Sequence, residues 1–169
     1  MRAAAAIRLL VLDVDGVLTD GRLYFGPRGE ALKVFDVRDG YGLVALQRTG
    51  VTVAVISGRR APAVSARCRE LGIRHLHQGV ADKRAVFERL RARLHLARSA
   101  CACVGDDLPD VPLMRSVALS FAVADAHPAA HGAATAVTRR GGGRGAVREV
   151  CDLLLAARSG RRTAPGRRR

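Results

Sequence analysis

Short apolar segments alternate along this chain with longer segments of helical period. The apolar segments predict strands at 7–14, 51–56, 74–77, 100–104, 117–123 and 134–137. The segments between and after them predict helices at 39–48, 61–71, 83–94, 110–116 and 146–157. Strands joined through helices form right-handed crossovers, which build a parallel sheet covered on both faces. The pattern therefore predicts an α/β fold in which the near-continuous apolar strands are buried on both sides.

One segment interrupts this alternation. Two β-prone runs, 22–25 and 30–35, flank a turn of Gly and Pro at 26–29, which predicts a β-hairpin. The hairpin follows the first strand, at the carboxyl end of the sheet, where α/β folds place their ligands. We expect it to act as a small flap, because the sequence leaves no room for a larger cap domain.

The length of 169 residues and the absence of a linker predict one domain over 1–159, followed by an Arg-rich tail over 160–169. The formal net charge is +14, and six arginines lie between position 158 and the end. We expect the tail to be flexible and inert. With four Phe, two Tyr and no Trp, the chain lacks stacking residues to accompany the charge, which disfavours nucleic-acid binding.

The chain is expected to work in the cytoplasm and without a membrane. No apolar stretch approaches the roughly 20 residues that span a bilayer, and the first residues are too weakly apolar for a secretory signal. The four cysteines do not have the spacing of a zinc site or a disulfide framework, so we interpret them as small buried apolar residues in a reducing compartment.

Acidic residues follow two of the predicted strands. Asp13 and Asp15 end the first strand, and Asp106 and Asp107 end the fourth, with Asp110 one turn later. The carboxyl ends of parallel strands meet at one edge, so up to five carboxylates face one crevice. Such a cluster is unfavourable unless a cation neutralises it, and oxygen ligands suit Mg²⁺. Helix capping would explain Asp107 or Asp110, but it does not explain acids at two strand ends together.

Two further strand ends carry groups that bind anions. Ser57, Gly58 and Arg59 follow the second strand, where a hydroxyl and backbone N–H groups before a helix form a phosphate site. Lys83, one of only two lysines, begins the helix after the third strand. Its ammonium group could hold a phosphate and offset the nearby carboxylates.

These residues form four ordered motifs that resemble the haloacid dehalogenase superfamily of phosphohydrolases. The motifs are Asp13-Val14-Asp15-Gly16-Val17-Leu18-Thr19-Asp20-Gly21, then Ser57-Gly58-Arg59, then Lys83, then Gly105-Asp106-Asp107-Leu108-Pro109-Asp110. Over roughly 7–158 the chain also resembles, more narrowly, the 3-deoxy-D-manno-octulosonate 8-phosphate phosphatase family. Segments 34–40, 77–79 and 142–149 add to that likeness, whereas 129–138 matches poorly and is expected to be a variable loop.

The resemblance implies a Rossmann-like sheet and a Mg²⁺-dependent phosphomonoesterase acting on a phosphorylated sugar acid. Asp13 would be the nucleophile that carries an aspartyl-phosphate, and Asp15 the general acid and base. Mg²⁺ would lie between the side chains of Asp13 and Asp106 and the main-chain carbonyl of Asp15. Ser57, Gly58 and Lys83 would hold the phosphoryl group. Asp107 and Asp110 would be auxiliary ligands.

In similar proteins, four subunits assemble so that the hairpin of one covers the site of a neighbour. The resemblance therefore implies a homotetramer, in which Arg59, Arg144 and the hairpin recognise the carboxylate of the sugar acid. Two other interpretations stay open. One is a phosphatase of nonulosonate 9-phosphates, because the motifs dictate phosphate chemistry and not the sugar. The other is a non-catalytic oligomerisation module, although Asp13 and Lys83 are both present. A receiver domain is disfavoured because its acceptor aspartate directly follows the third strand, and segment 75–79 contains no acid here.

Overall fold

A computed structural model describes residues 2–27 and 29–160 of the chain. Its centre is a six-stranded sheet in the order β5-β4-β1-β6-β7-β8, and all its strands run parallel. The strands are β1 (Leu9–Leu12), β4 (Thr52–Ser57), β5 (His75–Gln78), β6 (Cys101–Gly105), β7 (Leu119–Ala122) and β8 (Ala136–Val137). Each overlaps a strand that the sequence predicts, and the Rossmann-like α/β class is confirmed.

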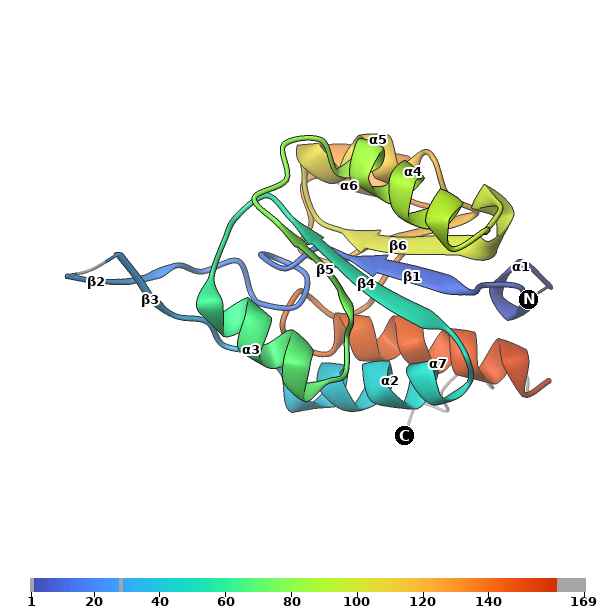
Figure 1. Ribbon diagram of the computed structural model, residues 1–169, viewed down its shortest axis with the longest axis horizontal. Helices are drawn as coiled ribbons and strands as arrows, with labels where there is room; N and C mark the ends of the chain where they lie inside the picture. The colour runs from blue at the N-terminus through green and yellow to red at the C-terminus, as the bar shows by residue number, and fades with distance from the viewer. Residues whose placement is uncertain (1, 28, 161–169) are drawn as a thin grey trace.

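Helices cover both faces of the sheet (Figure 1). On one face lie α2 (Val37–Arg48), α3 (Pro62–Glu70) and α7 (Ala146–Arg158), and on the other lie α4 (Lys83–Arg93), α5 (Val111–Met114) and α6 (Pro128–Ala133). The short α1 (Arg2–Ala5) packs beside α7. Two 3₁₀ turns, η1 (Arg98–Ala100) and η2 (Leu108–Asp110), flank β6. The apolar helix faces and the buried strands share one continuous core.

The register of the central strands brings the functional segments to one edge. β1 is buried along its whole length and pairs with β4 on one side and with β6 on the other. Leu12 lies opposite both Val55 and Val104, so the chain leaves all three strands at nearly the same level. The loops after β1, β4 and β6 therefore meet above the same edge, as the spacing of the motifs predicted.

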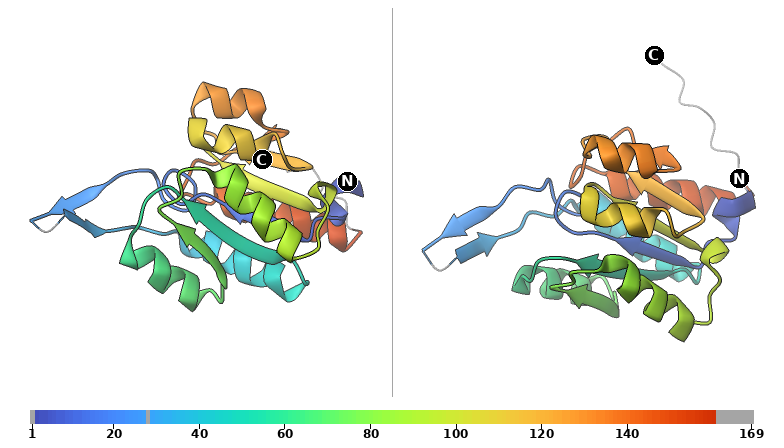
Figure 2. Two further views of the ribbon diagram at one scale, coloured as in Figure 1. Left: turned by 45° about the horizontal axis from the view of Figure 1, so that its top comes forward. Right: turned by 90° about the horizontal axis from the view of Figure 1, so that it is seen from above.

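The hairpin consists of β2 (Tyr24–Gly26) and β3 (Gly29–Leu32), paired antiparallel with an irregularity between Tyr24 and Phe25. It projects from the body of the domain (Figure 2). Large apolar side chains remain exposed along it, and Phe25 is 67% exposed. A two-stranded hairpin is marginally stable in water unless another surface covers it. The predicted flap is therefore present, and its apolar side chains lack cover among the described residues of this chain.

The structure differs from the sequence expectations in two places. Segment 129–138, expected to be a variable loop apart from the strand predicted at 134–137, also contains most of α6. His127 caps α6, because its Nδ1 accepts a hydrogen bond from the Ala129 N–H at 3.1 Å. The sequence analysis did not predict α1. The Arg-rich tail lies outside the described residues from position 161 onward.

All four cysteines are buried and free, as predicted. Among the described residues, no helix combines the length and the apolar character needed to cross a membrane.

Candidate active site

The loops at the carboxyl edge of the sheet enclose a cleft of about 330 Å³. It is lined by Asp13, Asp15, Ser57, Gly58, Arg59, Val80, Ala81, Lys83, Asp106, Asp107, Pro109 and Asp110. These residues include every site residue that the sequence predicts except Arg144. Larger hollows lie elsewhere on the surface, but they contain no comparable cluster of carboxylates.

Lys83 is the positive centre of this cleft. Its Nζ lies 2.7 Å from Oδ1 of Asp13 and 2.7 Å from Oδ1 of Asp110. The Lys83 side chain is only 6% exposed. Asp82 places it there, because the Asp82 carboxylate accepts a hydrogen bond from the Ala85 N–H and starts α4 at the lysine. Burial lowers the pKa of Lys83, but the two carboxylates more than offset this and raise it, so the group remains an ammonium.

Asp110 is more central than the sequence analysis suggested. Besides binding Lys83, its Oδ2 accepts hydrogen bonds from the backbone N–H groups of Asp106, at 3.1 Å, and Asp107, at 3.4 Å. Asp110 thereby fixes the turn that presents Asp106. Asp107 instead lies at the exposed rim, where its carboxylate accepts a hydrogen bond from the Leu108 N–H and caps η2. The two residues expected to be auxiliary ligands therefore differ in position. Asp110 lies at the centre of the site, and Asp107 lies at its rim.

Three of the carboxylates fit a divalent cation. Asp13, Asp106 and Asp110 each offer an oxygen, and these oxygens lie within 4.8 Å of one another. Burial, followed by the charge of Asp110, raises the pKa of Asp13 to about 6. Burial, followed by the charges of Asp13 and Asp110, raises the pKa of Asp106 to about 8. The single ammonium of Lys83 thus leaves negative charge uncompensated, and an oxygen-only donor set of this kind suits Mg²⁺.

Gly16 brings the loop after β1 close to Asp106. Its φ of +89° is disfavoured for other residues, and a Cβ there would lie 2.1 Å from Oδ2 of Asp106. Thr19 fixes the same loop, because its hydroxyl accepts hydrogen bonds from the N–H groups of Gly16 and Gly21 and donates one to the carbonyl of Val14. The motif that begins at Asp13 therefore folds into a rigid turn over the carboxylates.

Ser57 and Gly58 also reach the cleft, but the local structure differs from the expectation. Ser57 is 2% exposed, and its Oγ accepts a hydrogen bond from the Arg59 N–H at 3.2 Å. The following helix, α3, begins only at Pro62. Because the helix starts four residues after Gly58, the anion-binding N–H groups expected here belong to the loop and not to the helix N-terminus.

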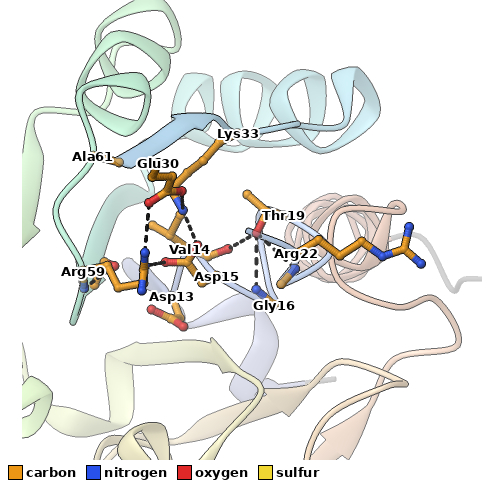
Figure 3. Close-up of polar contacts among 12 residues, drawn as sticks. Asp13, Val14, Asp15, Gly16, Thr19, Arg22, Glu30, Lys33, Arg59 and Ala61 are labelled. Carbon is orange, nitrogen blue, oxygen red and sulfur yellow. Dashed lines mark hydrogen bonds and ion pairs between the residues drawn. The ribbon is translucent and has the colours of Figure 1, made fainter. Parts of the chain in front are cut away.

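The Asp15 side chain points toward Lys33 and Arg59 and away from the carboxylate of Asp13 (Figure 3). Its Oδ1 accepts a hydrogen bond from Lys33, and its Oδ2 lies 3.9 Å from Nε of Arg59. The sequence analysis assigned a role to Arg59 but missed Lys33 and its partner Glu30. One available signal was that Lys33 is one of only two lysines.

Arg144 does not line the cleft in this chain. Its side chain is exposed, and its carbonyl accepts a hydrogen bond from Arg38 at 3.1 Å. The loop that holds it packs against the turn after β1, since the Gly143 N–H donates to the carbonyl of Val17 at 2.9 Å. The structure therefore places Arg144 next to the site and not inside it.

Comparisons with known proteins agree with this geometry. A family model described as haloacid dehalogenase-like hydrolase matches residues 73–147. The 3-deoxy-D-manno-octulosonate 8-phosphate phosphatase of Escherichia coli K12 is 56% identical over 154 residues, which cover 91% of this chain and 82% of the relative. The phosphatase of the same name from Salmonella typhi is 55% identical over 157 residues, which cover 93% of this chain and 84% of the relative.

Solved structures give the same result. The phosphatase of this name from Yersinia pestis superposes with a TM-score of 0.91 at 52% identity, covering 94% of this chain and 85% of that chain. The one from Moraxella catarrhalis, determined with a magnesium ion, a phosphate ion and a KDO molecule, gives 0.91 at 39% identity, covering 94% and 91%. The chain belongs to the haloacid dehalogenase-like hydrolases and, within them, to the 3-deoxy-D-manno-octulosonate 8-phosphate phosphatase family.

Proposed function

We propose that this chain hydrolyses 3-deoxy-D-manno-octulosonate 8-phosphate to 3-deoxy-D-manno-octulosonate and phosphate, as a Mg²⁺-dependent phosphomonoesterase. The observation that carries the proposal is the group of Asp13, Lys83, Asp106 and Asp110 at one sheet edge, in a chain so similar to phosphatases of that name. Bound by the side chains of Asp13 and Asp106 and the main-chain carbonyl of Asp15, with Asp110 as an auxiliary ligand, Mg²⁺ would neutralise charge and polarise the phosphoryl group.

Asp13 is the nucleophile in this proposal. Its carboxylate oxygen forms a bond to phosphorus, the bond between phosphorus and the sugar oxygen breaks, and Asp15 donates a proton to the departing oxygen. In the second step a water attacks phosphorus and gives its proton to Asp15, and the bond from phosphorus to Asp13 breaks. Lys83, which already contacts Asp13, stabilises the negative charge of the transferring group throughout.

Ser57 and Gly58 bind the phosphoryl oxygens through the hydroxyl and the loop N–H groups. Ser57 suits this role because its hydroxyl is buried at the cleft, where a hydrogen bond to an anion is strong. Arg59 is 43% exposed at the cleft mouth and would contact the sugar acid. Arg144 lies next to the site in its own chain, so it would contact the substrate only in the assembly, where another subunit packs against this part of the surface.

A phosphate-release screen tests the substrate. The purified chain is assayed on 3-deoxy-D-manno-octulosonate 8-phosphate, a nonulosonate 9-phosphate and glucose 6-phosphate, each with Mg²⁺ and with a chelator. We expect the highest kcat/KM on the first substrate and no release with the chelator. Faster hydrolysis of the nonulosonate phosphate would replace the proposed substrate, and a chain inactive on all three would support the non-catalytic alternative.

The active form in this proposal is a homotetramer in the cytoplasm. The apolar side chains along and beside the hairpin support the assembly, because Phe25, Val34, Val37 and Tyr41 are all more than half exposed. Burying such a patch against other copies would be favourable. Four buried free thiols support a reducing compartment.

Light scattering tests the assembly. Phe25→Glu should shift the tetramer toward smaller species and lower the activity on the sugar acid phosphate. Leu153→Glu is the matched control, because Leu153 is also exposed but lies on α7, on the body of the domain. A wild-type monomer with full activity would refute the proposed assembly.

A further inference from the structure

The hairpin base contacts the site of its own chain through a ring of four charged side chains. Lys33, just after β3, donates to Oδ1 of Asp15 and lies 2.5 Å from Oε1 of Glu30. Arg59 completes the ring, with Nη2 at 3.1 Å from Oε2 of Glu30 and Nε at 3.9 Å from Oδ2 of Asp15. Figure 3 shows the four side chains converging between the hairpin and the loop after β1.

The burial of this ring is uneven. The Lys33 side chain is 2% exposed and those of Glu30 and Asp15 are 12% and 18% exposed, whereas Arg59 is 43% exposed. A buried ammonium is costly unless carboxylates pair with it. Lys33 has two such partners, one on the hairpin and one in the site. Burial lowers the pKa of Lys33, but its contacts with the two carboxylates more than offset this and raise it, so the ammonium stays charged.

Asp15 depends on this ring for its orientation. It lies in the turn after β1, and the side chains that contact its carboxylate among the described residues are Lys33 and Arg59. A carboxylate that exchanges a proton with the substrate must be held in place by its neighbours, because small misplacements reduce the rate strongly. The more buried of its two partners belongs to the hairpin.

We propose that Lys33 is a positioning residue for Asp15, held in turn by Glu30, so that the base of the hairpin is part of the catalytic machinery of its own chain. The inference rests on the proposed function, in which Asp15 is the acid and base. It assigns the hairpin two separable roles. The exposed apolar side chains along and beside the hairpin, such as Phe25, serve assembly, and the charged side chains at its base hold Asp15.

The test compares Lys33→Met with wild type on two substrates. Lys33→Met keeps the length of the side chain and removes its charge. On 3-deoxy-D-manno-octulosonate 8-phosphate, whose alkoxide needs a proton to leave, we expect kcat to fall 10- to 100-fold while KM changes less than threefold. On 4-nitrophenyl phosphate, whose leaving group needs no proton, the fall should be several-fold smaller. Arg98→Met is the control and should stay within twofold of wild type, because Arg98 is 50% exposed, pairs with Glu88 and lies on η1, before β6 and away from the carboxyl edge of the sheet.

A double-mutant cycle separates positioning from a general structural effect. If Lys33 acts through Asp15, Lys33→Met should change the activity of Asp15→Asn on 4-nitrophenyl phosphate by less than twofold. An equal loss in both backgrounds, or a wild-type kcat in Lys33→Met, would overturn the proposal. If Lys33→Met does not fold, as judged by circular dichroism, Glu30→Gln enters the same cycle with a smaller expected loss. A wild type active on 4-nitrophenyl phosphate but not on the sugar acid phosphate would refute the proposed substrate and leave this test of Lys33 intact.

Discussion

Nζ of Lys83 lies 2.7 Å from Oδ1 of Asp13, the oxygen of the carboxylate that ends β1. The contact joins a residue at the start of α4 to one in the centre of the sheet, and both side chains are at least nine-tenths buried. Lys83 therefore offsets the charge of Asp13, the proposed nucleophile, before any substrate binds. It also competes with a divalent cation for the same negative charge, since Asp110 contacts it at the same distance.

Removing the charge of Lys83 should therefore have two opposite effects. In Lys83→Met, kcat should fall about 10²- to 10³-fold, because one electrostatic contact to the transferring group is lost. The affinity for Mg²⁺ should rise, because the carboxylates lose their internal cation. Phosphate release and calorimetric Mg²⁺ titration measure the two effects. A variant that binds Mg²⁺ more weakly than wild type would contradict this account.

The proposed role of Asp13 as nucleophile can be tested without disturbing the fold. Asp13→Asn keeps the shape of the side chain, and a neutral group suits a position where burial already raises the pKa of the carboxyl to about 6. We expect no detectable turnover and a melting temperature at or above that of wild type, measured in the presence of a chelator. Residual turnover above one per cent would show that another group attacks phosphorus.

Gly16 offers a test of the close approach between the turn and Asp106. In Gly16→Ala the new methyl group would overlap the Asp106 carboxylate, so we expect kcat to fall at least tenfold. Gly50→Ala is the matched control, because Gly50 has a similar φ of +84° but no atom within 4 Å of its Cβ position. Both variants should lose about 1–2 kcal/mol of stability from the backbone. Only Gly16→Ala should lose activity, and equal activity in the two would refute the steric argument.

Sequence periodicity predicted the sheet and the strand ends because both depend on local patterns. In a parallel sheet, residues that directly follow a strand lie at the carboxyl edge. The apolar run of β1 therefore places the acids after it at that edge. The same reasoning correctly placed Lys83 among these acids, since it begins the helix that follows β5. The structure agrees with these expectations because the register of the central strands fixes the level at which the loops after β1, β4 and β6 leave the sheet.

The contacts that sequence reasoning missed depend on distant segments. Lys33 meets Asp15 only because the hairpin returns to the sheet edge, and the irregularity between Tyr24 and Phe25 changes the pairing in a way no alternation reveals. Asp39 is a second case. It lies in the first turn of α2, yet its carboxylate accepts hydrogen bonds from the N–H groups of Gly145 and Arg148 at the start of α7.

Asp39 leads to a prediction about stability and pH. Burial, only partly offset by its backbone hydrogen bonds, raises the pKa of Asp39 from 3.8 to about 6. Between these values the folded protein binds a proton that the unfolded chain has released. The contribution of Asp39 to the free energy of unfolding therefore decreases as the pH rises toward 6 and is small above it. From pH 5 to pH 7 the expected loss is about 1 kcal/mol.

Asp39→Asn removes this dependence, because the amide does not titrate. Its oxygen can still accept the hydrogen bond from the Arg148 N–H, which is 2.7 Å long in the wild type. Urea unfolding of both proteins at pH 5, 6 and 7 isolates the effect, since the other titrating groups are common to the two chains. The difference in unfolding free energy should move in favour of Asp39→Asn by about 1 kcal/mol over this range. A constant difference, or one that moves in favour of wild type, would mean that the start of α7 keeps Asp39 ionised in the folded protein, through its N–H groups and its helix dipole.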